Sequence, residues 1–362
     1  MTVILIILMF SSLIVSFSDN PVLKNKYVIR TIIFSLIIYF SIMISSNLIE
    51  GTDLSSYIKS GEVYKSLNFI DLIKTTFPQS GLPIVQWIYF NFFNLPFFRF
   101  TVGLLSILPI LYGFKKSLNY QDLIILILCL FICFFYINGA TNIFKQSIAT
   151  AFYLGGIALF LKNFKINAYV FFIFSIFFHL SVAPFVILFI FIYYIKISIK
   201  KLIILNVVTI VLFITNLNRL LFSNIYFFGE GSQYARYAND VVINQYGGVN
   251  RIDFLLFNYF FIILFALCRK YFFKNDNYLF DNFYKVLLIN NFIFQLSGFV
   301  AYSDRIAFYV WMIIPLLMTI VISKLKEVNK LYILGLFAVY ILAFITNQGI
   351  FDLLQYYPFL FF

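Results

Sequence analysis

Charged residues are scarce in this sequence. Only 11% of its 362 residues are Asp, Glu, Lys or Arg, whereas 63% are hydrophobic. A soluble protein of this length covers its surface with polar groups, and so few charges cannot do that. Long apolar runs recur from Val3 to the C-terminus, and no segment between them is large enough to be a separate soluble domain. The composition therefore predicts a polytopic membrane protein.

Cysteine and histidine are also rare. The three cysteines are too few for a disulfide framework: Cys129 and Cys133 lie four residues apart in one apolar run, and Cys268 is alone. His179 is the only histidine, and the sequence has neither a Cys/His cluster nor an Asp-x-Asp pair. A metal site therefore has no obvious ligands, and we expect neither a metal nor another cofactor.

The apolar runs have the length of membrane-spanning helices. An α-helix needs about 20 apolar residues to cross roughly 30 Å of hydrocarbon, so we expect an all-α fold with about 12 transmembrane helices, outer-face loops and short helices. The predicted spans are residues 2–17, 30–49, 98–114, 121–137, 140–161, 166–179, 182–195, 202–221, 251–268, 279–302, 305–323 and 331–347. We expect residues 1–362 to form a single transmembrane domain, with residues 50–80 and 222–250 as its first and second long outer loops.

The basic residues between the spans indicate the orientation. They form six clusters: Lys24, Lys26 and Arg30; Lys115 and Lys116; Lys162 and Lys165; Lys196, Lys200 and Lys201; Arg269, Lys270 and Lys274; and Lys324, Lys326 and Lys330. If each cluster marks a cytoplasmic loop, the spans alternate sides without contradiction. The inner side then carries the whole formal net charge of +12. The basic balance thus reports orientation, and nucleic acid is not an expected partner.

Two stretches need a special interpretation. Residues 166–195 would make one helix of about 45 Å, too long for a single crossing, so we expect two legs with a break at His179, Ser181 and Pro184. The apolar stretch from Gly81 to Phe93 is predicted to be an outer-face or re-entrant helix, ended by Asn94 and Pro96. A crossing at that stretch is the alternative, and it would reverse the orientation of everything downstream.

Several polar residues gather on the predicted outer side. In the first outer loop, Asp53 and Tyr57 share one helix face if a helix starts there, with Thr52 or Asp53 as its cap. The alternative is that the aspartate is only a helix cap. The second loop carries Arg236 and Tyr237, and an arginine suits phosphate whereas tyrosine rings suit sugars. An aromatic belt at the membrane interface would also enrich tyrosine there.

Ionisable residues inside spans are costly and therefore informative. Lys145 lies about a turn and a half into a helix predicted to begin near Ala140, where it either serves a site or snorkels to the interface. Arg305 opens another span, and Tyr309 follows on the same helix face. A guanidinium at a helix N-terminus makes an anion site stronger than either alone, whereas a simple anchoring cap is the alternative.

His179 lies at the predicted outer turn between the two short legs. It is either a hydrogen-bonded structural residue or a base, and no other side chain of its type accepts protons near neutral pH. Five candidates that are far apart in sequence share one predicted depth: Asp53, Lys145, His179, Arg236 and Arg305.

Four groups of residues, taken in order, carry a resemblance to a known family. They are Gly51-x-Asp53-x-x-x-Tyr57; Asn142-x-Phe144-Lys145-Gln146-x-Ile148-Ala149, followed by Phe177-Phe178-His179-x-Ser181; Arg236-Tyr237; and Arg305-x-x-x-Tyr309. The ordered set resembles the EpsG-like group of Wzy polysaccharide polymerases over roughly residues 1 to 330. That group usually has arginine where this chain has Lys145, which offers a point charge in place of a bidentate fork.

The resemblance implies an enzyme, a glycosyltransferase of the cytoplasmic (inner) membrane whose site faces the periplasm or exterior. It would join oligosaccharide repeat units carried on undecaprenyl diphosphate into O antigen of lipopolysaccharide, capsule or exopolysaccharide, with a chain-length regulator and a flippase as pathway partners. Our hypothesis gives catalytic roles to three residues and substrate-binding roles to six. These are Asp53, His179 and Arg305 for catalysis, and Lys145, Arg236, Tyr57, Tyr237, Tyr309 and Asn142 for binding.

Other functions fit a polytopic protein of this charge pattern. A flippase of lipid-linked oligosaccharide would carry cations in a central cavity and similar halves with interrupted helices, and the sequence has no convincing internal repeat. An O-antigen ligase shares the substrate and the chemistry. A membrane acyltransferase would need a better supported base than His179, and a channel or secondary transporter would need more buried acids.

Overall fold

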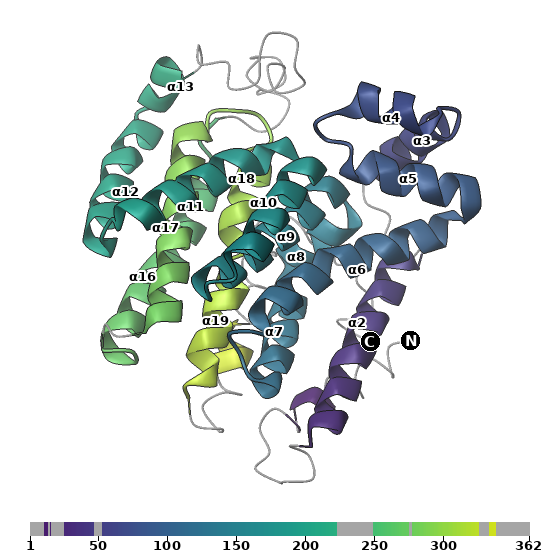
Figure 1. Ribbon diagram of the computed structural model, residues 1–362. Helices are drawn as coiled ribbons and strands as arrows, with labels where there is room; N and C mark the ends of the chain where they lie inside the picture. The colour runs from purple at the N-terminus through teal and green to yellow at the C-terminus, as the bar shows by residue number, and fades with distance from the viewer. Residues whose placement is uncertain are drawn as a thin grey trace. The chain divides into compact units, whose positions relative to one another are not determined.

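The secondary structure of the chain is helical throughout the part that is described. The computed structural model describes residues 11–13, 15, 25–46, 53–222, 249–274, 277–325 and 333–337, and these ranges contain no strand. The prediction of an all-α fold is therefore confirmed (Figure 1). The helices are α2 (Lys26–Ser45), α3 (Leu54–Lys65), α4 (Phe69–Thr76), α5 (Gly81–Phe92), α6 (Leu95–Phe114), α7 (Tyr120–Ile132), α8 (Phe134–Thr141), α9 (Phe144–Leu161), α10 (Lys165–Phe178), the 3-10 helix η1 (Leu180–Val182), α11 (Ala183–Ile195), α12 (Ile199–Ile214), α13 (Leu217–Phe222), α16 (Ile252–Tyr271), α17 (Tyr278–Ser297), α18 (Ser303–Trp311) and α19 (Ile314–Ser323).

The apolar helices make the chain a multi-pass membrane protein. Within the described ranges, five segments are long and apolar enough to cross a membrane: Lys26–Ser45, Leu95–Phe114, Phe144–Leu161, Ile252–Tyr271 and Ser303–Ser323. α7 and α8, bent by 74° at their junction, add a sixth if they form one broken span. The predicted number of about 12 transmembrane helices is not confirmed.

Two of the predicted spans, residues 2–17 and 331–347, lie mostly outside the described residues. Length and polarity explain why other predicted spans do not qualify. α11 has 13 residues, which rise about 20 Å and fall short of the roughly 30 Å of hydrocarbon. α17 has 20 residues but includes Asp281, Lys285 and a buried pair, Asn290 and Asn291. A window of apolar residues in the sequence therefore does not by itself give a helix of spanning length.

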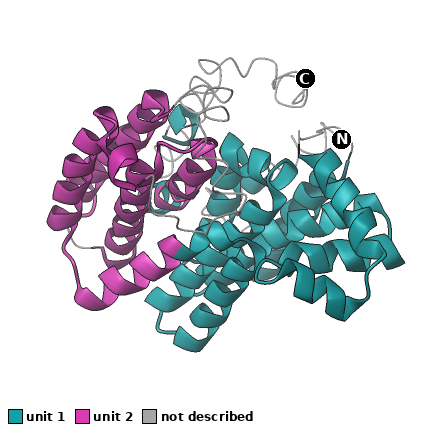
Figure 2. Cartoon of the chain, turned by 90° about the horizontal axis from the view of Figure 1, so that it is seen from above, with its two compact units in different colours: residues 1–183, 318–362 teal, residues 184–317 magenta. Residues whose placement is uncertain are grey.

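The described helices group into two compact units. Unit 1 contains residues 1–183 and 318–362, and unit 2 contains residues 184–317 (Figure 2). The border falls at Pro184, next to the break that the sequence predicts between residues 166–179 and 182–195. That break is confirmed, because α10 ends at Phe178 and α11 begins at Ala183 after one turn of 3-10 helix.

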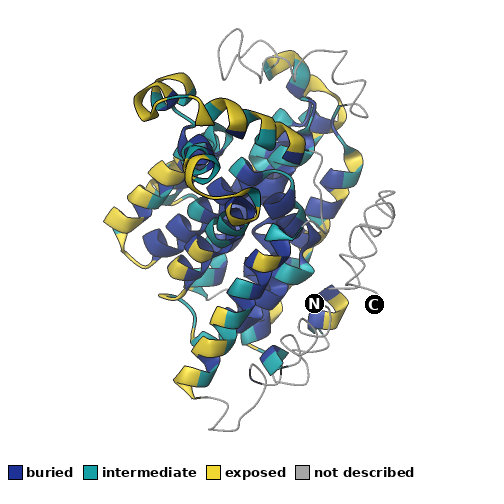
Figure 3. Cartoon of the chain, turned by 90° about the vertical axis from the view of Figure 1, so that its right-hand side faces the viewer, coloured by how far each residue is buried: buried dark blue, intermediate teal, exposed yellow. Residues whose placement is uncertain are grey.

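Unit 1 is built around α9, which packs against α6 and α10, while α2 packs against α6. The contact between α6 and α9 depends on small residues. A Cβ atom added to Gly155 would lie 2.2 Å from the carbonyl oxygen of Pro109, and one added to Gly113 would lie 2.4 Å from the carbonyl oxygen of Gly155. Such close backbone approach is typical of helix packing in membranes. Most helices of the chain carry both buried and exposed residues (Figure 3).

Unit 2 is held together by buried amide side chains. Asn291 of α17 donates to Asn206 of α12 at 2.8 Å, and Asn258 of α16 donates to Asn291 at 2.9 Å. The indole N–H of Trp311 in α18 in turn donates to Asn258 at 2.9 Å. Because a buried polar group must be paired, this chain of hydrogen bonds fixes four helices in one register.

The segment predicted as the first outer loop, residues 50–80, is largely helical where it is described, since it contains α3 and α4. The predicted helix after it is α5, which has 12 residues and ends before Phe93. Asn94 starts the next helix: its side chain accepts from the backbone N–H of Phe97 and caps α6. The outer-face position of α5 stays a prediction.

Candidate functional site

The start of α3 lies against the junction between α8 and α9. Asp53 precedes the first residue of α3, and its side chain makes no capping hydrogen bond to that helix. Its backbone N–H donates to Oδ1 of Asn142 at 3.0 Å. One turn into α3, the ring of Tyr57 stacks on Phe144, with 4.7 Å between the centroids and 15° between the planes. Two motifs that lie 89 residues apart in sequence therefore meet in unit 1.

The helix at this junction is broken twice. α7 and α8 meet at Cys133 with a bend of 74°, and Asn142 and Ile143 then separate the end of α8 from the start of α9. No side chain caps the N-terminus of α9. In membrane proteins, interrupted helices of this kind place helix ends and polar residues together at the depth of the bilayer.

Lys145 is the second residue of α9. The sequence places it a turn and a half inside a helix beginning near Ala140, which is wrong: the chain leaves the helical path at Asn142, so α9 begins at Phe144. Lys145 is partly buried and forms no hydrogen bond or ion pair with another described residue. A lysine at a helix N-terminus adds its charge to the positive end of the helix dipole, so the position suits an anion.

One hydrophobic cluster explains why these candidates lie in one region. Leu54, Phe144 and Phe178 are buried in the same cluster, together with Leu82, Phe98, Val102, Ile148 and Ala149. Asp53, Lys145 and His179 are each the chain neighbour of a cluster member, so their Cα atoms lie about 3.8 Å from it. Burial of the three apolar neighbours thus anchors the three polar candidates around one core.

His179 ends α10 with extended backbone and faces η1. Its Nδ1 atom accepts from the backbone N–H of Ser181 at 3.2 Å. A neutral imidazole that accepts at Nδ1 carries its proton on Nε2. In this arrangement the ring offers an N–H donor at Nε2 rather than a free basic nitrogen.

Arg305 and Tyr309 belong to unit 2. Arg305 is in the first turn of α18, after Tyr302, whose φ of 61° is left-handed, and its guanidinium carbon lies 4.8 Å above the ring of Tyr302. Tyr309 is only 1% exposed and packs against Phe185 at 4.3 Å between ring centroids, while its carbonyl oxygen accepts from Asn290 at 2.8 Å. Arg305 is partly exposed, whereas Tyr309 is a core residue of its unit.

The sequence model of the EpsG family matches residues 30–361. The chain belongs to the EpsG family. This confirms the resemblance found in the sequence, and the matched range includes all nine candidate residues. Membership associates the chain with polysaccharide biosynthesis at a membrane. No curated protein and no solved structure matches this chain.

In this EpsG family protein, two further polar residues lie next to the candidates of unit 1 and were not among the residues predicted from the sequence. Arg99 of α6 has a fully buried side chain and follows Phe98 of the cluster. Gln86 of α5 is buried and donates from Nε2 to the carbonyl oxygen of Tyr57 at 2.7 Å and to Ser60 at 3.0 Å, which ties α5 to α3. The signal for Arg99 is an arginine inside an apolar run. Gln86 carries no comparable signal.

Two candidates of the EpsG family protein, Arg236 and Tyr237, lie outside the described residues. Across the residues that are described, no three His, Cys, Asp or Glu side chains gather as metal ligands would.

Proposed function

We propose that this EpsG family protein is a polysaccharide polymerase. It joins oligosaccharide repeat units carried on undecaprenyl diphosphate into a surface polysaccharide (O antigen, capsule or exopolysaccharide). The growing chain is transferred from its lipid carrier to the next unit at the outer face of the cytoplasmic membrane. Membership in the family and the multi-pass architecture support this proposal.

The hydrogen bond from Asp53 to Asn142 is the observation that carries the proposal. It joins a carboxylate-bearing helix start to a second helix start that bears Lys145. A sugar diphosphate leaving group already carries negative charge, so catalysis needs cations and free N–H groups that hold it as it departs. An uncapped helix N-terminus with a lysine supplies both.

In the reaction that we propose, the acceptor hydroxyl attacks the anomeric carbon of the donor sugar. The bond between that carbon and the diphosphate oxygen breaks, and the diphosphate leaves on its lipid carrier. Asp53, whose backbone is hydrogen-bonded to Asn142 beside the start of α9, takes the proton of the acceptor. His179 then orients a substrate oxygen through Nε2–H, since its Nδ1 atom is bound to Ser181. A carboxylate near the anomeric carbon also stabilises oxocarbenium character in the transition state.

The remaining candidates hold the substrate in this scheme. Lys145, Arg236 and Arg305 bind the diphosphate, and Asn142 keeps Asp53 in place. The guanidinium groups offer a bidentate fork to phosphate, whereas Lys145 offers a point charge. Tyr57 and Tyr237 contact sugar rings, and Tyr309 positions the helix of Arg305 from inside unit 2.

The charge distribution supports a site at the outer face. The basic clusters of the sequence lie between spans on the predicted inner side of the membrane. The same prediction places Asp53, His179 and Arg305 on the outer side. A flippase from the same pathway would supply the lipid-linked units to this face, and a chain-length regulator is the other expected partner.

The fate of lipid-linked glycan in cells lacking the protein tests the proposal. Without a polymerase, single repeat units reach the cell surface and long chains disappear, and the intact gene restores them whereas Asp53→Asn does not. Long chains that accumulate on the carrier would instead identify a ligase. Units retained on the inner side would identify a flippase, and either result would overturn the proposal.

A further inference from the structure

A cavity lies within unit 2, and none of the candidate residues of the polymerase scheme lines it. Its volume is about 500 Å³, a size that suits a small ligand or a lipid headgroup. It opens between the C-terminal end of α11 and the first three turns of α17. The lining residues are Phe189, Ile192, Tyr193, Lys196, Asn277, Tyr278, Asp281, Asn282, Lys285 and Ile289.

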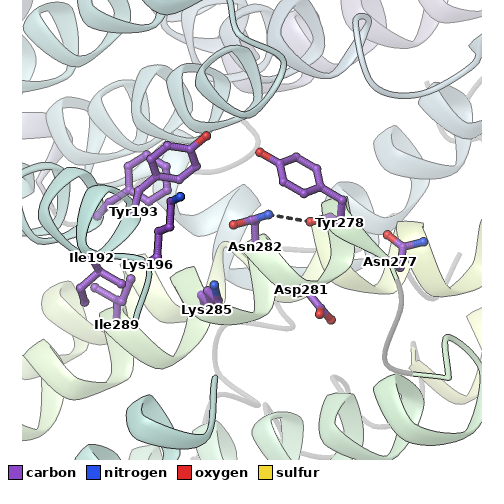
Figure 4. A pocket seen from close by; sticks show the side chains of 10 residues that line it. Ile192, Tyr193, Lys196, Asn277, Tyr278, Asp281, Asn282, Lys285 and Ile289 are labelled. Carbon is purple, nitrogen blue, oxygen red and sulfur yellow. Dashed lines mark hydrogen bonds between the residues drawn. The ribbon is translucent and has the colours of Figure 1, made fainter. Parts of the chain in front are cut away.

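Hydrogen-bond donors converge on this cavity. Figure 4 shows the ammonium group of Lys196 and the hydroxyl groups of Tyr193 and Tyr278 directed into the same space. Asn282 lies at its floor, and its Nδ2 atom donates to the carbonyl oxygen of Tyr278 at 2.8 Å. The hydroxyl groups of Tyr193 and Tyr278 form a hydrogen bond with each other, which leaves one hydroxyl proton and the ammonium groups to donate to the oxygens of a phosphate.

The charge facing the cavity is positive. Asp281 is the one acid of the lining, and Arg269 of α16 binds it in bidentate fashion at 2.8 and 3.0 Å. In Figure 4 its carboxylate points away from Lys196 and Tyr193. Lys196 and Lys285 form no ion pair with any residue in the described ranges. Two lysine charges are therefore left for an anionic ligand.

This end of unit 2 has the charge pattern of a cytoplasmic membrane surface. Lys200 and Lys201 lie in the first turn of α12, and Arg269 and Lys270 lie in the last turn of α16. The cavity lining also includes apolar residues, and Tyr194 and Ile195, next to Tyr193, are more than half exposed. An apolar flank beside a basic pocket is suited to a ligand with a phosphate and a hydrocarbon chain.

We propose that this cavity binds a phosphate ester, with Lys196 and Lys285 as its cationic contacts and the hydrogen-bonded hydroxyl pair of Tyr193 and Tyr278 as a further donor. The ester is either the headgroup of an anionic membrane lipid or a soluble organic phosphate. Because the site shares no residue with the polymerase scheme, it remains even if that scheme fails.

The test measures binding to the purified full chain in detergent, by native mass spectrometry and by thermal stabilisation. The probes are phosphatidylglycerol, phosphatidylcholine and glycerol 3-phosphate. A lysine contributes about 1 kcal/mol to contact with an anionic lipid, which is about fivefold in affinity. Lys196→Gln and Lys285→Gln should each weaken binding about fivefold, and the double variant about 25-fold. Lys200→Gln, an exposed lysine of the same end that does not line the cavity, should have little effect.

The outcomes separate the sources of the phosphate. Binding of phosphatidylglycerol with little binding of phosphatidylcholine or glycerol 3-phosphate, lost in the double variant, assigns the site to a lipid headgroup. Binding of glycerol 3-phosphate with the same loss assigns it to a soluble ester. If Lys200→Gln loses as much affinity as the cavity variants, the binding depends on diffuse surface charge, and the proposal is overturned. If neither phosphatidylglycerol nor glycerol 3-phosphate binds to protein that has its normal melting temperature, the proposal is also overturned.

Discussion

The backbone N–H of Asp53 and the side-chain oxygen of Asn142, which are 3.0 Å apart, connect two helix starts of unit 1. Asn142 lies between the end of α8 and the start of α9, and its backbone N–H donates to the carbonyl oxygen of Asn138 in α8 at 2.9 Å, whereas its side chain accepts from the start of α3. Its side chain thus serves α3 instead of its own helix. This contact joins the backbone of Asp53 to the residue that lies three positions before Lys145.

Substitution of Asn142 should therefore lower activity through Asp53. Asn142→Ala removes the acceptor and leaves the N–H of Asp53 unpaired at a cost of about 1–3 kcal/mol. Transfer of repeat units by the purified protein should fall between about fivefold and about 150-fold, since 1.4 kcal/mol corresponds to one decade in rate. Asn142→Gln keeps an uncharged amide acceptor and is the closer control. Equal activity of Asn142→Ala and the wild type would show that the contact does not position Asp53.

Lys145 should act through its charge. Lys145→Met keeps the length and the apolar stem of the side chain but removes the cation at the start of α9, so glycan transfer should fall about 100-fold. Lys145→Arg should retain activity, because a guanidinium can contact phosphate with two N–H groups. Lys162→Met removes an exposed lysine at the opposite end of the same helix and should leave the rate unchanged. If both methionine variants lost activity equally, charge at the helix start would not be the cause.

The helical class, the break near His179 and the helix after residue 80 could be predicted from the sequence. Each depends on local information: apolar length, a proline at position 184, and polar residues at the ends of an apolar run. The start of α9 could not be predicted in this way. The apolar run continues through Asn142, and the break there accompanies a hydrogen bond to Asp53, a residue 89 positions away.

The hydrogen bonds inside unit 2 could not be predicted from the sequence either. Asn206, Asn258 and Asn291 each stand in an apolar run, and the sequence shows the cost of burying them but not the partner that offsets it. Only the packing of α12, α16 and α17 brings their amides within 2.9 Å of one another. Of the site, the residue types were predictable, whereas their contacts were set by the shared cluster around Phe144.

Arg305 should be required for transfer but not for folding. Its side chain is partly exposed and its guanidinium group lies over the ring of Tyr302 near the start of α18, outside the buried core of the unit, so Arg305→Ala should keep its melting temperature. Polymer formation by the purified variant should be lost, and Arg305→Lys should recover only part of it because lysine lacks the planar fork. Near-normal product from Arg305→Ala would remove this residue from the scheme.

The contact between α6 and α9 should tolerate no side chain at Gly155. A Cβ atom there would lie 2.2 Å from a backbone oxygen of Pro109, and a backbone atom cannot move aside as a side chain can. Gly155→Ala should therefore destabilise the purified protein by about 3 kcal/mol, measured as a lower melting temperature in detergent. The atoms nearest to a Cβ atom added at Gly156 are side-chain atoms, two in the ring of Phe172 and the Cβ atom of Phe171, so the effect of Gly156→Ala should be smaller. Gly335→Ala has open space around the added atom and should be neutral. If Gly155→Ala and Gly335→Ala melt at the same temperature, the two helices do not approach as closely as their small residues indicate.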